Sequence, residues 1–134
     1  MAKNSIYRLN VKKFKAINWI VVGLLIVLIG AMVIRPVPML PEKDLVVITG
    51  KVVEIYEGGV KDVNLKLEGR RELFYVNRGL QKGLNLQELK AQLIKEDITI
   101  KYPDHWSLLN FNKSNLHISK IEHRGKTVFT EVSN

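Results

Sequence analysis

Residues 16–34, AINWIVVGLLIVLIGAMVI, contain no charged side chain and are bounded by Lys15 and Arg35. As an α-helix, these 19 residues would extend about 28 Å, close to the thickness of the hydrocarbon core of a bilayer. The stretch therefore predicts a single transmembrane helix, and the lipid bilayer is its expected partner.

The net charge of +8 is distributed unevenly along the chain. Residues 1–44 carry seven basic and two acidic side chains, whereas residues 45–134 carry fourteen and eleven. By the positive-inside rule, this asymmetry predicts a single-pass protein of the inner (cytoplasmic) membrane, with a cytoplasmic N-terminus and an extracytoplasmic C-terminal domain. A cleaved signal peptide is the first alternative, although Ile29-Gly30-Ala31 is a poor cleavage site. A buried helix of a soluble domain is the second, although one small domain hardly covers such a helix on all sides.

The composition divides the chain into four parts. Residues 1–15 are expected to form a basic cytoplasmic tail and residues 16–34 the transmembrane helix. Residues 35–44 contain three prolines, which end the helix and favour a stiff spacer. Residues 45–134 suffice for one small domain. The chain has no cysteine, which excludes disulfides, thiolate metal sites and a cysteine nucleophile.

The pattern of apolar residues changes after the spacer and becomes typical of strands. Strands are predicted at residues 45–56, 63–67, 72–76, 98–102, 116–122 and 127–132. Gly50 marks a kink or bulge in the first strand, and a second bulge is expected near Ser119. Asn85 is expected to cap a short helix that ends near Lys95.

Three strands, a helix and two or three further strands follow one another in this order. The order, together with Gly50 in the long first strand, resembles the OB-fold, a small five-stranded barrel with one helix between strands 3 and 4. The segments 97–102 and 121–126 are also similar to those of small, uncharacterised bacterial envelope proteins with one anchor helix. The alternative architecture is an open α+β sheet with one packed helix.

Asp104, His105 and Trp106 are the cluster that most resembles a catalytic or metal site, because a histidine beside a carboxylate can act as a base or as a ligand. Adjacent residues rarely converge on one point, however, and His117 and His123 do not have a recognised ligand spacing. No nucleotide-binding, zinc-protease or serine-hydrolase motif occurs. We therefore expect no enzyme activity, no metal and no cofactor.

Aromatic and basic residues of the predicted strands and turns form the candidate binding face. Its members are Tyr56, Tyr75, Arg70, Arg71, Lys101 and Trp106. Such a face suits an oligosaccharide or a single-stranded nucleic acid, and the mild charge of residues 45–134 disfavours nucleic acid. The first hypothesis is a non-enzymatic, membrane-anchored extracytoplasmic module that binds an envelope or membrane protein or assists assembly. The alternative is a ligand-binding barrel that uses the aromatic–basic face.

Overall fold

The computed structural model describes residues 2–33, 39–105 and 112–132. The chain divides into two compact units, one containing the N-terminal helix and the other the strands. We call the second the β unit and describe each unit by itself.

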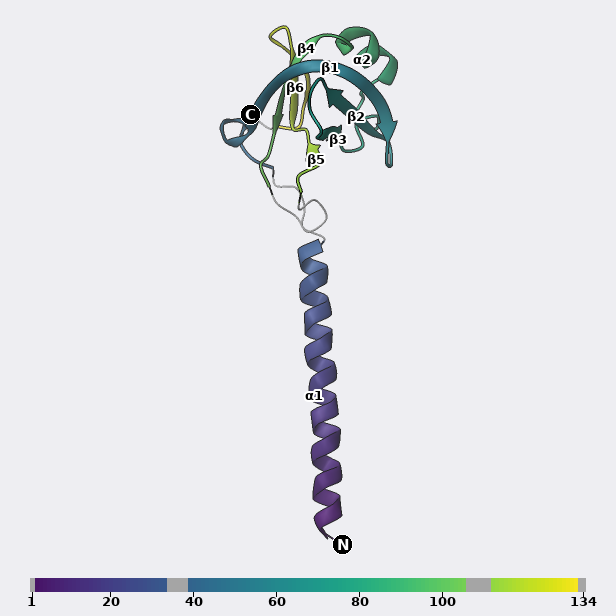
Figure 1. Ribbon diagram of the computed structural model, residues 1–134, viewed down its shortest axis with the longest axis vertical. Helices are drawn as coiled ribbons and strands as arrows, with labels where there is room; N and C mark the ends of the chain where they lie inside the picture. The colour runs from purple at the N-terminus through teal and green to yellow at the C-terminus, as the bar shows by residue number, and fades with distance from the viewer. Residues whose placement is uncertain (1, 34–38, 106–111, 133–134) are drawn as a thin grey trace. The chain divides into compact units, whose positions relative to one another are not determined.

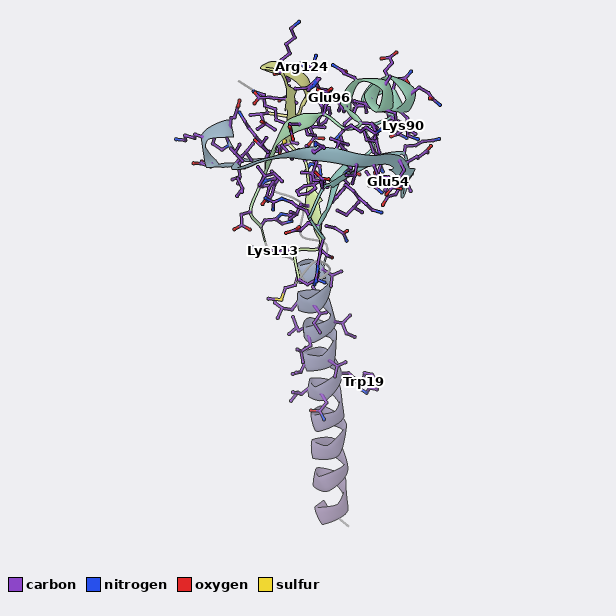
Figure 2. The ribbon with its side chains drawn as sticks, turned by 45° about the horizontal axis from the view of Figure 1, so that its top comes forward. Trp19, Glu54, Lys90, Glu96, Lys113 and Arg124 are labelled. Carbon is purple, nitrogen blue, oxygen red and sulfur yellow. The ribbon has the colours of Figure 1, made fainter. Side chains whose placement is uncertain are left out.

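Helix α1 (Ala2–Val33) forms the first unit, so residues 16–33 of the apolar stretch are helical (Figure 1). Its apolar side chains are exposed, for example Trp19 at 75% and Val27 at 69%, and Figure 2 shows Trp19 extending away from the helix. Within the part of the chain that the structure describes, no helix is both long enough and apolar enough to cross a membrane.

The predicted transmembrane helix over 16–34 is wrong by this finding. The predictions that depend on this helix are corrected with it: the signal anchor, the single-pass topology, the inner-membrane localisation and the periplasmic placement of the β unit.

The described residues of the β unit form a seven-stranded mixed sheet in the order β5-β3-β2-β1-β4-β6-β7. The strands are β1 (Val46–Gly58), β2 (Asp62–Leu67), β3 (Leu73–Val76), β4 (Asp97–Tyr102), β5 (Asn115–His117), β6 (Lys120–His123) and β7 (Lys126–Thr130). A 3-10 turn, η1 (Glu42–Asp44), precedes β1, and helix α2 (Leu86–Leu93) lies between β3 and β4 in sequence. Strands β3 and β5 pair in parallel, and the other pairs are antiparallel.

Strand β1 serves both halves of the sheet (Figure 1). Its first half pairs with β4, from Val46 to Lys51, and its second half pairs with β2. The register shifts between Val52 and Glu54. The bulge therefore does not lie at Gly50, where it was predicted, but a few residues later. Gly50 has a different role: a Cβ there would lie 3.1 Å from Leu67 Cδ1, so the glycine lets β2 approach.

The predicted closed five-stranded barrel is wrong, because the sheet is open and its end strands β5 and β7 are not paired with each other among the described residues. The physical reason is that the predicted strand 116–122 is interrupted at Ile118 and Ser119. Its first part, β5, pairs with β3, and its second part, β6, pairs with β4. The alternative, an open α+β sheet with one packed helix, describes the β unit correctly.

Helix α2 forms where the sequence predicts it. The side chain of Asn85 accepts hydrogen bonds from the backbone N–H groups of Gln87 and Glu88, which confirms the expected N-cap. Leu89 and Leu93 are buried and join the core, while Lys90 is exposed. The rest of the core comes from alternate positions of the strands, with Phe74, Leu65 and Ile100 fully buried.

Candidate functional site

Four residues from neighbouring strands form a row across the β1–β2–β3–β5 half of the sheet. The backbone register pairs Tyr56 with Asn64, Asn64 with Tyr75, and Tyr75 with His117. Paired residues project from the same face of a sheet, so these four side chains share one face. We call them the Tyr56–His117 row.

The opposite face of the same strands packs into the core. Each residue of the row is preceded or followed by a core residue, and these form a parallel row of Ile55, Leu65, Phe74 and Leu116. Because side chains alternate between faces, burial of this apolar row holds the Tyr56–His117 row on the outward face.

His117 is the most constrained member of the row, with 9% of its surface exposed. Its Nε2 lies 2.8 Å from Glu131 Oε2, and Glu131 also accepts a hydrogen bond from Lys82 Nζ. The ring meets Tyr75 edge-on, with 5.4 Å between ring centroids. Its Nδ1 is buried and has no hydrogen-bond partner among the described residues. A buried polar atom without a partner is costly, so this nitrogen is an uncompensated polar atom beneath the row.

Asn64 sits between the two tyrosines and is also 9% exposed. A Cβ on Gly58 would lie 2.1 Å from Asn64 Nδ2, so only glycine leaves room for this amide. Within the described residues the Asn64 amide makes no hydrogen bond. An amide carries donors and an acceptor together, which makes Asn64 a second polar group that a ligand can engage.

The two tyrosines are half-buried but differ in their surroundings. Burial, followed by the negative charges of Asp62 and Glu131, raises the pKa of Tyr75, so its hydroxyl stays protonated. Lys66 Nζ lies 5.4 Å from the centre of the Tyr56 ring, a cation–π contact. That lysine is paired with Glu54 at 2.7 Å, so its charge is balanced.

The predicted binding face is only partly assembled. Tyr56 and Tyr75 share the row, whereas Arg70 and Arg71 are exposed in the turn between β2 and β3. Lys101 lies on β4 in the other half of the sheet, where its ammonium contacts Glu42 at 2.5 Å and Glu122 at 3.3 Å. Trp106 lies outside the described residues.

The Asp104–His105 cluster does not form a site in the described structure. Asp104 is ion-paired with Lys113, and within the described residues no hydrogen bond or ion pair joins His105 to Asp104. No group of three potential metal ligands gathers anywhere in the described residues.

The contacts of two histidines with glutamates were not predicted from the sequence. His117 contacts Glu131, and His123 Nε2 lies 3.3 Å from Glu96 Oε2. The partners are 14 and 27 residues apart, and no local pattern marks them. The only usable signal in the sequence is the alternation of side chains along the strand, which puts His117 on the face opposite Leu116. Its register with Tyr75 follows only once β3 and β5 are known to pair.

Comparison with protein-family models, curated proteins and solved structures finds no significant match to this chain. The resemblance to small bacterial envelope proteins therefore stays a prediction, and the function rests on the geometry of the site.

Proposed function

We propose that the β unit is a non-enzymatic binding module and that the Tyr56–His117 row binds an uncharged oligosaccharide. The observation that carries the proposal is the row itself: two half-exposed tyrosines flank the Asn64 amide, which has no hydrogen-bond partner among the described residues. Sugar rings offer an apolar face for aromatic contact and hydroxyl groups for hydrogen bonds, and the row supplies both.

The spacing of the row suits a chain of sugar units rather than a single unit. Tyr56 and Tyr75 are two strands apart, which corresponds to about 10 Å. The Asn64 amide lies between them, and His117 lies beyond Tyr75. Ligand sites commonly combine apolar contact area with a few fixed polar groups of this kind.

The charges around the row favour a neutral ligand. Lys66 is paired with Glu54 at 2.7 Å, and Lys82 is paired with Glu131. Single-stranded nucleic acids are held by grooves of unpaired positive charge beside stacking aromatic rings. The neighbouring lysines of the row are neutralised, so nucleic acid is the weaker candidate.

The surroundings of His117 support binding rather than proton transfer. The ring is almost fully covered, and its Nε2 is held by Glu131. A general base needs direct access to the proton that it removes, whereas the fixed imidazole holds the Tyr75 ring in place through their edge-on contact.

An array of neutral oligosaccharides, probed with the full chain, tests the proposal. Any oligosaccharide that binds is then titrated by calorimetry against the wild type, Asn64→Ala and Tyr75→Ala. Each variant removes a side chain that the proposed site uses to contact the oligosaccharide, so we expect the affinity for the oligosaccharide to fall about tenfold or more. Val47→Ala is the matched control, because Val47 is 56% exposed and lies on the half of β1 that pairs with β4.

The outcomes separate the alternatives. Loss of binding in both row variants with retention in Val47→Ala supports the proposal. Binding that survives both row substitutions overturns it, as does the absence of binding to every neutral oligosaccharide. Salt-sensitive binding of single-stranded DNA without oligosaccharide binding would establish the nucleic-acid alternative instead.

A further inference from the structure

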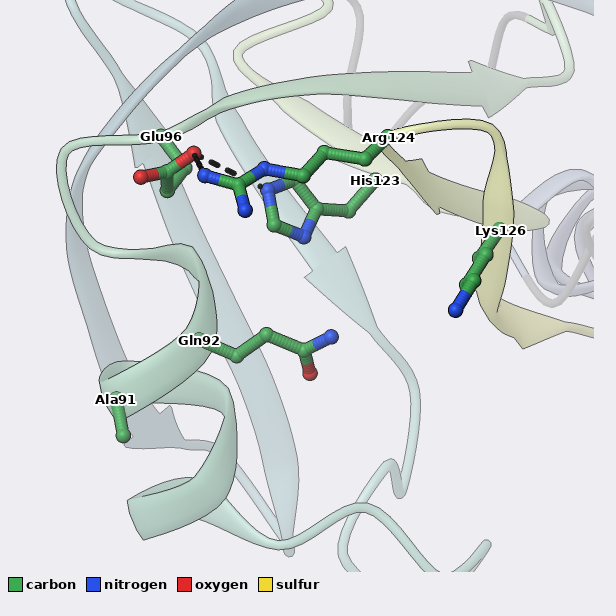
Figure 3. A pocket seen from close by; sticks show the side chains of 6 residues that line it. All are labelled: Ala91, Gln92, Glu96, His123, Arg124 and Lys126. Carbon is green, nitrogen blue, oxygen red and sulfur yellow. Dashed lines mark hydrogen bonds and ion pairs between the residues drawn. The ribbon is translucent and has the colours of Figure 1, made fainter.

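A second polar site lies in the β unit, away from the Tyr56–His117 row. A cavity of about 430 Å³ opens between α2 and the β6–β7 hairpin (Figure 3). Its lining consists of Ala91, Gln92, Glu96, His123, Arg124 and Lys126. Its volume falls in the range of about 300–1,000 Å³ that is usual for small-molecule pockets.

The hairpin fixes two of these side chains on one face. Arg124 and Gly125 form its two-residue turn, with φ values of +51° and +75°, as a type I′ turn requires. The register pairs His123 directly with Lys126, so both project to the same side of the hairpin. His123 is 7% exposed, which makes it a fixed wall of the cavity.

One carboxylate oxygen of Glu96 is engaged on the other side of the cavity. Its Oε2 lies 3.3 Å from His123 Nε2 and 2.8 Å from an Arg124 guanidinium nitrogen. Hydrogen bonds from His123 and Arg124, with the positive charge of Arg124, lower the pKa of Glu96 and keep it ionised. It therefore balances one of the two permanent positive charges of the cavity.

The second positive charge is not balanced. Within the described chain, neither the Lys126 ammonium nor the Gln92 amide has a hydrogen-bond or ion-pair partner. Figure 3 shows both side chains extending into the space between the helix and the hairpin. One net positive charge and two sets of free donors therefore face the same cavity.

We propose that this cavity binds the phosphate group of a small phosphomonoester. Lys126 supplies a point charge, which suits a phosphate, Gln92 donates from the opposite wall, and Arg124 lies at the rim with 73% of its side chain exposed. The cavity is larger than a phosphate ion alone, so the site has room for the group that carries the phosphate. The site is independent of the oligosaccharide proposal, since it uses none of its residues.

Titration of the full chain with glucose 6-phosphate, followed by amide NMR at constant ionic strength, tests this inference. Saturable shifts are expected at Gln92, His123 and Lys126. Lys126→Gln removes the charge and keeps a polar side chain, so the dissociation constant should rise about tenfold. Lys90→Gln is the matched control, because Lys90 is an exposed lysine of α2 that does not line the cavity (Figure 2).

Parallel titrations with inorganic phosphate and with glucose identify the source of binding. Equal affinity for inorganic phosphate and the ester assigns the site to the phosphate group alone, and tighter binding of the ester assigns the larger ligand; both support the site. Binding of glucose that equals that of the ester overturns it. So does the absence of saturable shifts, or an equal effect of Lys90→Gln and Lys126→Gln, since either shows that no specific phosphate site exists.

Discussion

Replacing Phe74 with alanine is expected to destabilise the β unit severely. Phe74 is fully buried at the centre of the apolar row behind the Tyr56–His117 row, paired with Leu65 and Leu116. Truncating a buried phenylalanine costs about 3–5 kcal/mol, because both burial and packing are lost. Its edge-to-face contact with Tyr102, at 6.1 Å between centroids, is worth about 0.5–1.5 kcal/mol of that sum.

The loss is large compared with the total stability of a domain of this size, about 5–15 kcal/mol. Urea denaturation, followed through the NMR signals of the β-unit amides, measures it. With a slope of about 2 kcal/mol per molar urea, the midpoint should fall by about 2 M. Val60→Ala is the control, because Val60 is 71% exposed and its loss should change stability by less than about 0.5 kcal/mol. A loss below about 1 kcal/mol for Phe74→Ala would refute the assigned core.

Three further substitutions test the connections around the sheet. Hydrogen bonds and charges of Lys101 and Lys120 hold the pKa of Glu42 at about 2, against an ordinary 4.5. The stabilisation from ionised Glu42 is therefore complete above about pH 4.5 and is lost as the pH falls towards 2. The urea midpoints of the wild type and of Glu42→Gln should therefore differ near neutral pH and converge at acidic pH. Asn85→Ala removes the N-cap acceptor of α2 and should cost about 0.5–2 kcal/mol in the same assay. Gly125→Ala places a side chain at φ +75° in the β6–β7 turn and should cost about 1–2 kcal/mol, measured likewise.

Each of these expectations has an outcome that contradicts it. A pH-independent difference between wild type and Glu42→Gln would show that the ion pairs with Lys101 and Lys120 do not form. Gln87→Ala alters an exposed residue of the same helix turn; if it destabilises as much as Asn85→Ala, the capping role is wrong. Unchanged stability of Gly125→Ala would mean that the turn does not have the left-handed backbone described.

The local elements of the β unit were predictable because their signals are local. Alternating apolar residues located β2 and β4, and the order Asn85 to Glu88 located the start of α2. The sequence also grouped Tyr56 and Tyr75 in one candidate face, although only the register of β2 shows that they share a row with Asn64.

The long-range features were not predictable in the same way. The two parts of segment 116–122 pair with different strands, and the sequence shows only a change of parity at that point. Lys101 was expected in a binding face, but Glu42, 59 residues away, engages its charge. The prediction of a membrane helix depended only on the length of residues 16–34 and on their lack of charge. Among the described residues, no helix is both long enough and apolar enough to cross a membrane.

The continuity of β1 makes the β unit a single cooperative structure. Val52, at the middle of β1, donates its N–H to Glu96 O at 3.0 Å and accepts from Lys95 N at 2.8 Å, just where the strand passes from β4 to β2. Neither half of the sheet can separate from the other without breaking this strand. Its pairing with β4 also joins residues about fifty positions apart, and such distant contacts slow folding. The two binding sites proposed above therefore belong to one cooperative structure rather than to independently formed pieces.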